Sequence, residues 1–140
     1  MNVIENEIVK VWAALCIGEI KCKPKSKKTC RCNQKEKTYI YCFVRQDIPT
    51  VHQIIQTGHA CQESGAKFGC PPECYMTLIG VKDQQELQQV ADYLQMHNID
   101  SVMFNETDPP EAPMGYTSIC TEPIYGATRR KLKKYQLYRP

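Results

Sequence analysis

The segment 45–65, RQDIPTVHQIIQTGHACQESG, holds the residues whose types and spacing could do chemistry. It predicts a helix in which Gln56 and His59, three residues apart, share one face. Gly58 and Ala60 beside them are small enough to admit another backbone or a ligand. A histidine, with an ordinary pKa of about 6.5, can act as a general base or orient a water molecule. The segment therefore predicts a polar site on one helix face. The alternative is that His59 is a packed, hydrogen-bonded side chain.

The elements around that helix indicate the fold that must position it. Aromatic, β-branched and apolar runs predict strands at residues 38–46, 75–81, 101–106 and 116–122. Amphipathic spacing predicts helices at residues 50–64 and 83–97, and a short basic helix at 128–135. The order β-α-β-α-β-β-α predicts an α/β fold, a single three-layer domain with a mixed four-stranded sheet flanked by helices.

Local signals are expected to fix the helix ends. Thr50 with Gln53, and Asp83 with Glu86, have the spacing of a capping box at a helix start. Gly65 is expected to end the first of the two helices, because glycine readily adopts the backbone conformation of a helix C-terminus.

The chain of 140 residues is expected to comprise an N-terminal extension, residues 1–37, and a domain, residues 38–140. The extension combines a predicted helix at 3–20 with a basic linker at 21–37. No apolar run approaches the ~20 residues of a membrane span. The acidic start, MNVIENEIVK, lacks the basic region of a secretory signal, so a cytoplasmic location is expected.

Charge is unevenly distributed along the chain. Residues 21–37 carry a net charge of +7 and residues 126–140 carry +6, so the remainder carries −10 against an overall +3. Two basic segments on an acidic body favour an anionic partner, with nucleic acid first among the candidates. The alternative is that both segments are simply solvated.

Nine cysteines, an odd number, favour free thiols in a cytoplasmic chain. Those beside apolar residues are expected to be buried as small hydrophobic groups: Cys42, Cys61 and Cys120. A different possibility is a zinc-stabilised interaction module, in which the metal ligands would include Cys22, Cys30 and Cys32.

Three short motifs, in this order, resemble those of the type II peptidyl-tRNA hydrolase family. RQDI (45–48) matches the family's Arg–x–Asp strand end, and QTGHA (56–60) matches its Gln–x–x–His–Ala helix element. TSICTEP (117–123) matches a later strand that begins with Thr and closes on Pro. The order of elements agrees over residues 38–137.

The sequence departs from that family at two places. Thr50 and His52 stand where the family has paired lysines. The segment NETDPPE (105–111) replaces the family's Asp–Ala–Gly–Arg–Thr–Gln, which puts Asn105 at the acidic position and Glu106 next to it. The chain therefore resembles a divergent branch of the family.

The resemblance implies an enzyme that hydrolyses the ester joining a peptide to the 3′ ribose of tRNA. Such an ester needs a positioned water, a base and a donor to the developing oxyanion. The resemblance assigns catalysis to His59 and Thr117. Glu106 stands one residue from the family's acidic position and is expected to supply the missing acidic group. Each also has a plain alternative: Thr117 is then an ordinary strand residue, and Glu106 a solvated acid before a loop.

The implied partners are tRNA and a second copy of the chain, with neither a cofactor nor a membrane. Substrate binding is assigned to Gln56, His52 and Asp47, although His52 can equally be a surface residue and Asp47 a helix cap. Contacts with tRNA phosphates are assigned to the basic C-terminal residues Arg129, Arg130, Lys131, Lys133 and Lys134. The alternative function is RNA binding without catalysis on the same fold.

Overall fold

The structure is a computed structural model that describes residues 36–140. The helix expected at residues 3–20 lies outside the described residues, as does nearly all of the basic linker. The candidate zinc ligands Cys22, Cys30 and Cys32 lie there too. In the described part of the chain, none of the helices has the length and apolar content of a membrane span.

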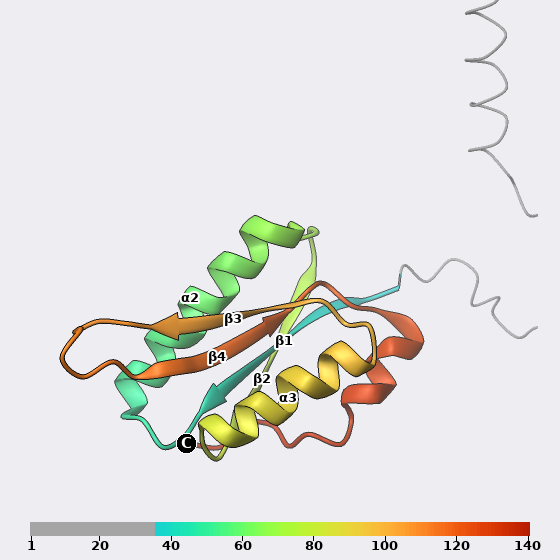
Figure 1. The fold of residues 1–140 in the computed structure, drawn as a ribbon. Helices are drawn as coiled ribbons and strands as arrows, with labels where there is room; N and C mark the ends of the chain where they lie inside the picture. The colour runs from blue at the N-terminus through green and yellow to red at the C-terminus, as the bar shows by residue number, and fades with distance from the viewer. Residues whose placement is uncertain (1–35) are drawn as a thin grey trace, which may run out of the picture. The chain divides into compact units, whose positions relative to one another are not determined.

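The described residues form an α/β domain whose elements follow the predicted order (Figure 1). These elements are β1 (Thr38–Arg45), α2 (Thr50–Phe68), β2 (Cys74–Val81), α3 (Gln84–Met96), β3 (Ser101–Glu106), β4 (Gly115–Thr121) and η2 (Gly126–Leu132). The last element, η2, is a 3₁₀ helix. The predicted α/β fold class and the four strands are therefore confirmed.

The four strands form one mixed sheet in the order β2-β1-β4-β3. β1 and β2 run parallel, and α2 supplies the crossover that a parallel pair requires. β4 runs antiparallel to both of its neighbours, with Cys42 opposite Cys120 where it pairs with β1. The pairing of β3 with β4 shifts at Phe104, and Thr117 is left without a partner residue across the ladder.

Helices cover both faces of the sheet, α2 on one side and α3 with η2 on the other (Figure 1). Successive residues of β1 point to opposite faces. Phe43 packs into the larger apolar core on the α3 side, together with Leu87 and Leu132. Cys42 packs toward α2 in a smaller cluster. Burying a side chain of the size of Phe or Leu contributes roughly 1.5–3 kcal/mol, so the α3 side supplies most of the apolar stabilisation.

α2 attaches to the sheet by a largely polar face. Its buried residues recur at helical spacing and are mostly polar: Gln53, Gln56, Thr57, Ala60 and Ser64. By contrast, Val51 and Ile54 on its outer side are 66% and 69% exposed. Polar groups on the inner face must therefore find hydrogen-bond partners in the sheet, which the site described below provides.

The predicted helix ends are only partly correct. Asp83 does cap α3, since its side chain accepts a hydrogen bond from the Glu86 N–H at 2.9 Å. Thr50 and Gln53 form no capping box, because the Gln53 amide instead donates to the Ile48 carbonyl at 2.7 Å. The expected stop at Gly65 is also wrong.

α2 continues to Phe68, and the positive φ of 75° falls at Gly69. The Gly69 N–H donates to the Gly65 carbonyl there, so Gly65 belongs to the last turn of the helix.

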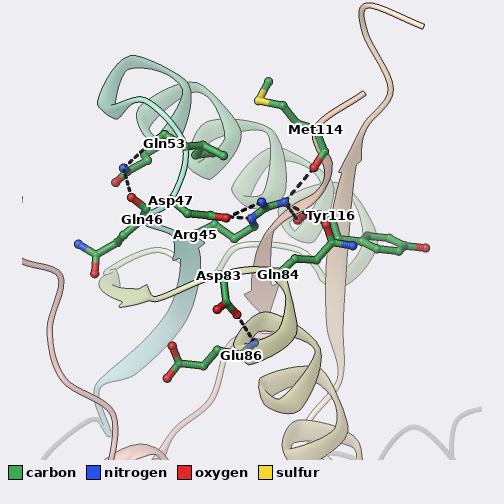
Figure 2. A network of polar contacts seen from close by, with 10 residues as sticks. Arg45, Gln46, Asp47, Gln53, Asp83, Gln84, Glu86, Met114 and Tyr116 are labelled. Carbon is green, nitrogen blue, oxygen red and sulfur yellow. Dashed lines mark hydrogen bonds and ion pairs between the residues drawn. The ribbon is translucent and has the colours of Figure 1, made fainter. Parts of the chain in front are cut away.

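Arg45, the last residue of β1, joins three parts of the domain (Figure 2). Its Nε and one terminal nitrogen donate to both carboxylate oxygens of Asp47, at 2.8 and 2.7 Å. The other terminal nitrogen donates to the Met114 and Tyr116 carbonyls, at 2.8 and 3.1 Å, and to the Gln84 side chain at 3.1 Å. The start of β4 and the first turn of α3 are thereby held at the end of β1.

The carboxylate of Asp47 is committed to that ion pair. The Arg45 hydrogen bonds lower the pKa of Asp47 and raise the pKa of Arg45. α2 begins after Pro49 without any side-chain cap. The interpretation of Asp47 as a helix cap is therefore wrong, because its carboxylate faces the guanidinium instead.

Replacing Arg45 with lysine should destabilise the domain by about 2 kcal/mol, since an ammonium keeps the charge but cannot reach all of these acceptors. Urea unfolding monitored by circular dichroism would measure the change. Arg130→Lys, at an exposed position, is the matched control and should leave the unfolding midpoint in place. Equal unfolding midpoints for the two variants would show that Arg45 stabilises the domain through its charge alone and not through its several hydrogen bonds.

Acid should remove the contribution of Asp47 to stability. Its folded-state pKa lies below the ordinary 3.8, so the contribution is complete above about pH 4 and is lost as pH falls through the folded value. The difference in unfolding free energy between the native chain and Asp47→Asn should therefore shrink below about pH 4. A difference that stays constant down to pH 2 would contradict this assignment.

Candidate active site

The Gln56 side chain lies at the centre of the candidate site, between α2 and the sheet. It is 1% exposed, and both ends of its amide are hydrogen bonded. Its Nε2 donates to a Glu106 carboxylate oxygen at 2.9 Å, and its Oε1 accepts from the Thr117 hydroxyl at 3.3 Å. The backbone carbonyl of Gln56 also accepts from the Ser118 hydroxyl, at 2.7 Å. The amide is therefore fixed with its donor end toward a carboxylate.

Two successive residues of β4 reach Gln56 because the strand is irregular at this point. Ser118 pairs with Phe104 and Tyr116 with Asn105, so Thr117 is an extra residue between them. A β-bulge of this kind re-aims side chains that a regular strand would send to opposite faces. It turns both hydroxyls toward α2.

Glu106 ends β3 and is half-buried. Its carboxylate accepts hydrogen bonds from Gln56 and, at 3.0 Å, from the Asp108 N–H. These bonds lower the pKa of Glu106, and the nearby His59 adds a smaller effect in the same direction. Glu106 is therefore a carboxylate at neutral pH, able to orient a donor but not to deliver a proton.

His59 lies about one turn after Gln56 on α2 and is exposed. Its ring stacks on Phe104 of β3, with the ring centroids 4.8 Å apart and the planes 12° from parallel. Stacking fixes the plane of the imidazole while leaving the side chain accessible to solvent. The structure thus brings His59, Gln56 and Glu106 together beside the middle of α2.

Thr117 lies behind Gln56. It is fully buried and its hydroxyl donates to the amide, so it orients Gln56 and does not face solvent. His52 is half-buried on α2, four residues before Gln56 and thus on the same helix face. Asp47 is held by Arg45, as described above.

Two of the basic C-terminal residues, Arg129 and Lys131, donate hydrogen bonds to the domain itself. The Arg129 guanidinium lies 3.3 Å from the centroid of the Tyr39 ring, and its Nε donates to the Tyr41 hydroxyl at 3.3 Å. The Lys131 ammonium donates to the His97 carbonyl at 3.2 Å. Both cations therefore help to hold η2 against the domain.

The structure does not bring the basic residues together with Gln56. Lys134 lies over the Tyr93 ring of α3, with its nitrogen 3.3 Å from the centroid. Arg130 and Lys133 are exposed. All five belong to η2 or directly follow it, on the α3 side of the sheet, whereas the Gln56 site lies on the α2 side.

Sequence reasoning missed Phe104 and Ser118 as parts of the site. The sequence does indicate Phe104, because it is two residues before Glu106 and therefore lies on the same face of the strand. His59 and Gln56 are three apart on the facing helix, which matches that spacing. Nothing in the sequence indicates Ser118, because in a regular strand its side chain would lie on the face opposite that of Thr117. Only the β-bulge turns it toward α2.

Of the two small residues near Gln56, Gly58 and Ala60, only Ala60 lies where the helix backbone comes close to the sheet. Ala60 is fully buried against Cys42 and Cys120 of the sheet. Gly58 is exposed, and a Cβ there would meet no heavy atom within 4 Å. The helix therefore approaches the sheet at Ala60, and Gly58 faces open space.

Comparison with known proteins shows the fold. No family model matches the sequence, and no curated protein matches it. Solved structures do match. Among them is a protein of unknown function from Agrobacterium tumefaciens strain C58, with a TM-score of 0.56 and 12% sequence identity. The match covers 74% of this chain and 98% of that protein, so the two share an α/β architecture over most of their length.

Proposed function

We propose that this chain hydrolyses the ester bond of peptidyl-tRNA at the site formed by His59, Gln56 and Glu106. The observation that carries the proposal is the buried Gln56 amide, which holds the Glu106 carboxylate beside an exposed histidine. A carboxylate and an imidazole that face the same solvent can bind and activate one water molecule.

In this mechanism His59 is the general base and Glu106 orients the water. The lowered pKa of Glu106 makes it a weak base, whereas an imidazole is suited to accept a proton at neutral pH. His59 takes a proton from water, whose oxygen adds to the ester carbonyl carbon. The tetrahedral intermediate then expels the ribose 3′ oxygen, which takes the proton from the imidazolium, and peptide and free tRNA separate.

His52 would stabilise the oxyanion. It lies four residues before Gln56 on the same helix face, and an imidazole N–H is a hydrogen-bond donor. In the type II peptidyl-tRNA hydrolases that the sequence resembles, a lysine stands at this point.

The substrate class rests on that resemblance and on the basic segments. Arg130 and Lys133 are exposed but lie across the sheet from His59. In our proposal these cations therefore contact the body of the tRNA while the 3′ end reaches α2. The homodimer expected from the resemblance remains a prediction.

RNA binding without turnover is the second candidate. The stacked pair of His59 and Phe104 favours it, since an exposed ring can also stack on an unpaired base. Release of N-acetyl-aminoacyl groups from tRNA by the full chain, measured beside tRNA affinity, separates the two candidates. Binding without release would establish the second and reject hydrolysis.

Glu106→Gln should lower that release by ~100-fold or more, because an amide cannot orient the water and stabilise the imidazolium as a carboxylate does. Glu111→Gln, an exposed acid in the same β3–β4 loop, is the matched control and should retain full turnover. Equal losses in the two variants, or none in either, would remove Glu106 from the reaction.

Thr117→Val should destabilise the domain by about 1 kcal/mol, because the Gln56 oxygen loses its buried donor. Release should fall by ~10-fold or more as the amide and its carboxylate shift. Thr117→Ser restores the hydroxyl and should recover most of the activity. A serine variant as inactive as the valine variant would mean that the threonine methyl group matters, and not the hydrogen bond.

A further inference from the structure

Three cysteine thiols meet between α2 and the sheet, away from the Gln56 amide. Cys42 of β1 and Cys120 of β4 are opposite each other in the antiparallel ladder, and both are fully buried. Cys61 reaches them from α2 and remains partly exposed. All three sulfur atoms lie within 4.8 Å of one another, and those of Cys61 and Cys120 are 3.9 Å apart.

A fourth sulfur completes the group. The Met76 thioether of β2 lies 3.5 Å from the Cys61 sulfur. The four sulfur atoms therefore come from four different elements: β1, α2, β2 and β4. Sequence alone gave no sign of this arrangement, because the four residues are scattered over 79 positions and each appears singly in an apolar context.

The separation of the Cys61 and Cys120 sulfur atoms fits metal coordination and not a disulfide. A disulfide requires sulfur atoms ~2.05 Å apart, far closer than these. A metal ion with metal–sulfur bonds of ~2.3 Å holds its ligand sulfurs roughly 3.8–4.0 Å apart at tetrahedral to trigonal angles. Cys61 and Cys120 already have that separation.

We propose that Cys42, Cys61 and Cys120 bind a monovalent copper ion, with Met76 as a weaker fourth ligand. Thiolate and thioether ligands are soft, and a donor set of sulfur alone selects soft ions such as Cu(I). Structural zinc sites nearly always use four ligands drawn from thiolates, imidazoles and carboxylates. In residues 36–140 this cluster supplies three such ligands, and the fourth neighbour is a thioether.

An apolar groove gives the ion a path to the cluster. The groove has a volume of about 510 Å³, and Cys61 and Met76 form part of its wall with Gly58 and Leu78. Cys61 and Met76 are thus the sulfurs an incoming ion meets first, and Cys42 and Cys120 lie behind them. Gly58 keeps the helix side of the groove free of a side chain.

The test uses the full chain with its six other cysteines replaced by serine: Cys16, Cys22, Cys30, Cys32, Cys70 and Cys74. Under anaerobic reducing conditions, Cu(I) is titrated in competition with a chromophoric Cu(I) chelator. We expect one equivalent of Cu(I) to bind. Cys61→Ser in this background should weaken binding by at least ~100-fold, since a first ligand is lost.

Met76→Leu should weaken Cu(I) binding by ~10-fold while preserving the shape of the side chain. Met96→Leu, an exposed methionine on α3, is the matched control and should bind Cu(I) normally. Circular dichroism of each metal-free variant verifies that the fold is retained, so that lost binding is not lost folding.

Three results would overturn the proposal. These are less than one equivalent bound by a folded chain, unchanged affinity in Cys61→Ser, and tighter binding of Zn(II) than of Cu(I) in direct competition. The first two would identify the thiols as ordinary packing groups, and the third would exclude copper as the ion.

Discussion

The buried Gln56 amide is the constraint on which the α2 side of this domain depends. An amide inside a protein costs about 1–3 kcal/mol for each end left without a partner. Gln56 satisfies its oxygen with Thr117 and its nitrogen with Glu106. The helix, the end of β3 and the irregular start of β4 must therefore keep one relative arrangement. Among the described residues, no buried side-chain nitrogen or oxygen lacks a hydrogen-bond partner.

The two faces of the sheet are held by different interactions. On the α3 side, large apolar side chains such as Phe43, Leu87 and Leu94 form the main core. On the α2 side, hydrogen bonds and small side chains join helix to sheet. Arg45 links the start of α3 to the start of β4 at one end of the sheet, because its partners include the Gln84 side chain and the carbonyl of Tyr116. The polar and thiol side chains on which both proposals rest therefore lie beneath and beside α2.

The sequence predicts the element order and the fold class because strands and helices have different periods of hydrophobicity. It also predicts the α3 cap, which depends on residues only three apart. It brings His59 and Gln56 to one helix face for the same local reason. The sequence does not predict contacts between residues that are far apart in the chain.

The residues next to Arg45 in the sequence do not indicate that its guanidinium will reach the Met114 carbonyl, because that contact joins positions 69 residues apart. Likewise, the extra residue at Thr117 depends on how β3 and β4 pair, which no local pattern shows. The end of α2 was missed because either Gly65 or Gly69 can terminate a helix, and only the chain path decides between them.

Ala60 sets the distance on which both groups beneath α2 depend. It is fully buried and packs with Cys42 and Cys120, so it determines how closely the helix approaches the sheet. Gln56 is four residues before it and Cys61 one residue after it. The Gln56–Thr117 hydrogen bond and the Cys61–Cys120 sulfur separation are therefore set by one helix–sheet spacing. A larger side chain at position 60 would lengthen both distances together, because a close-packed interior cannot absorb added volume locally. The small side chain of Ala60 thus sets the helix–sheet spacing that both the polar site and the thiol cluster require.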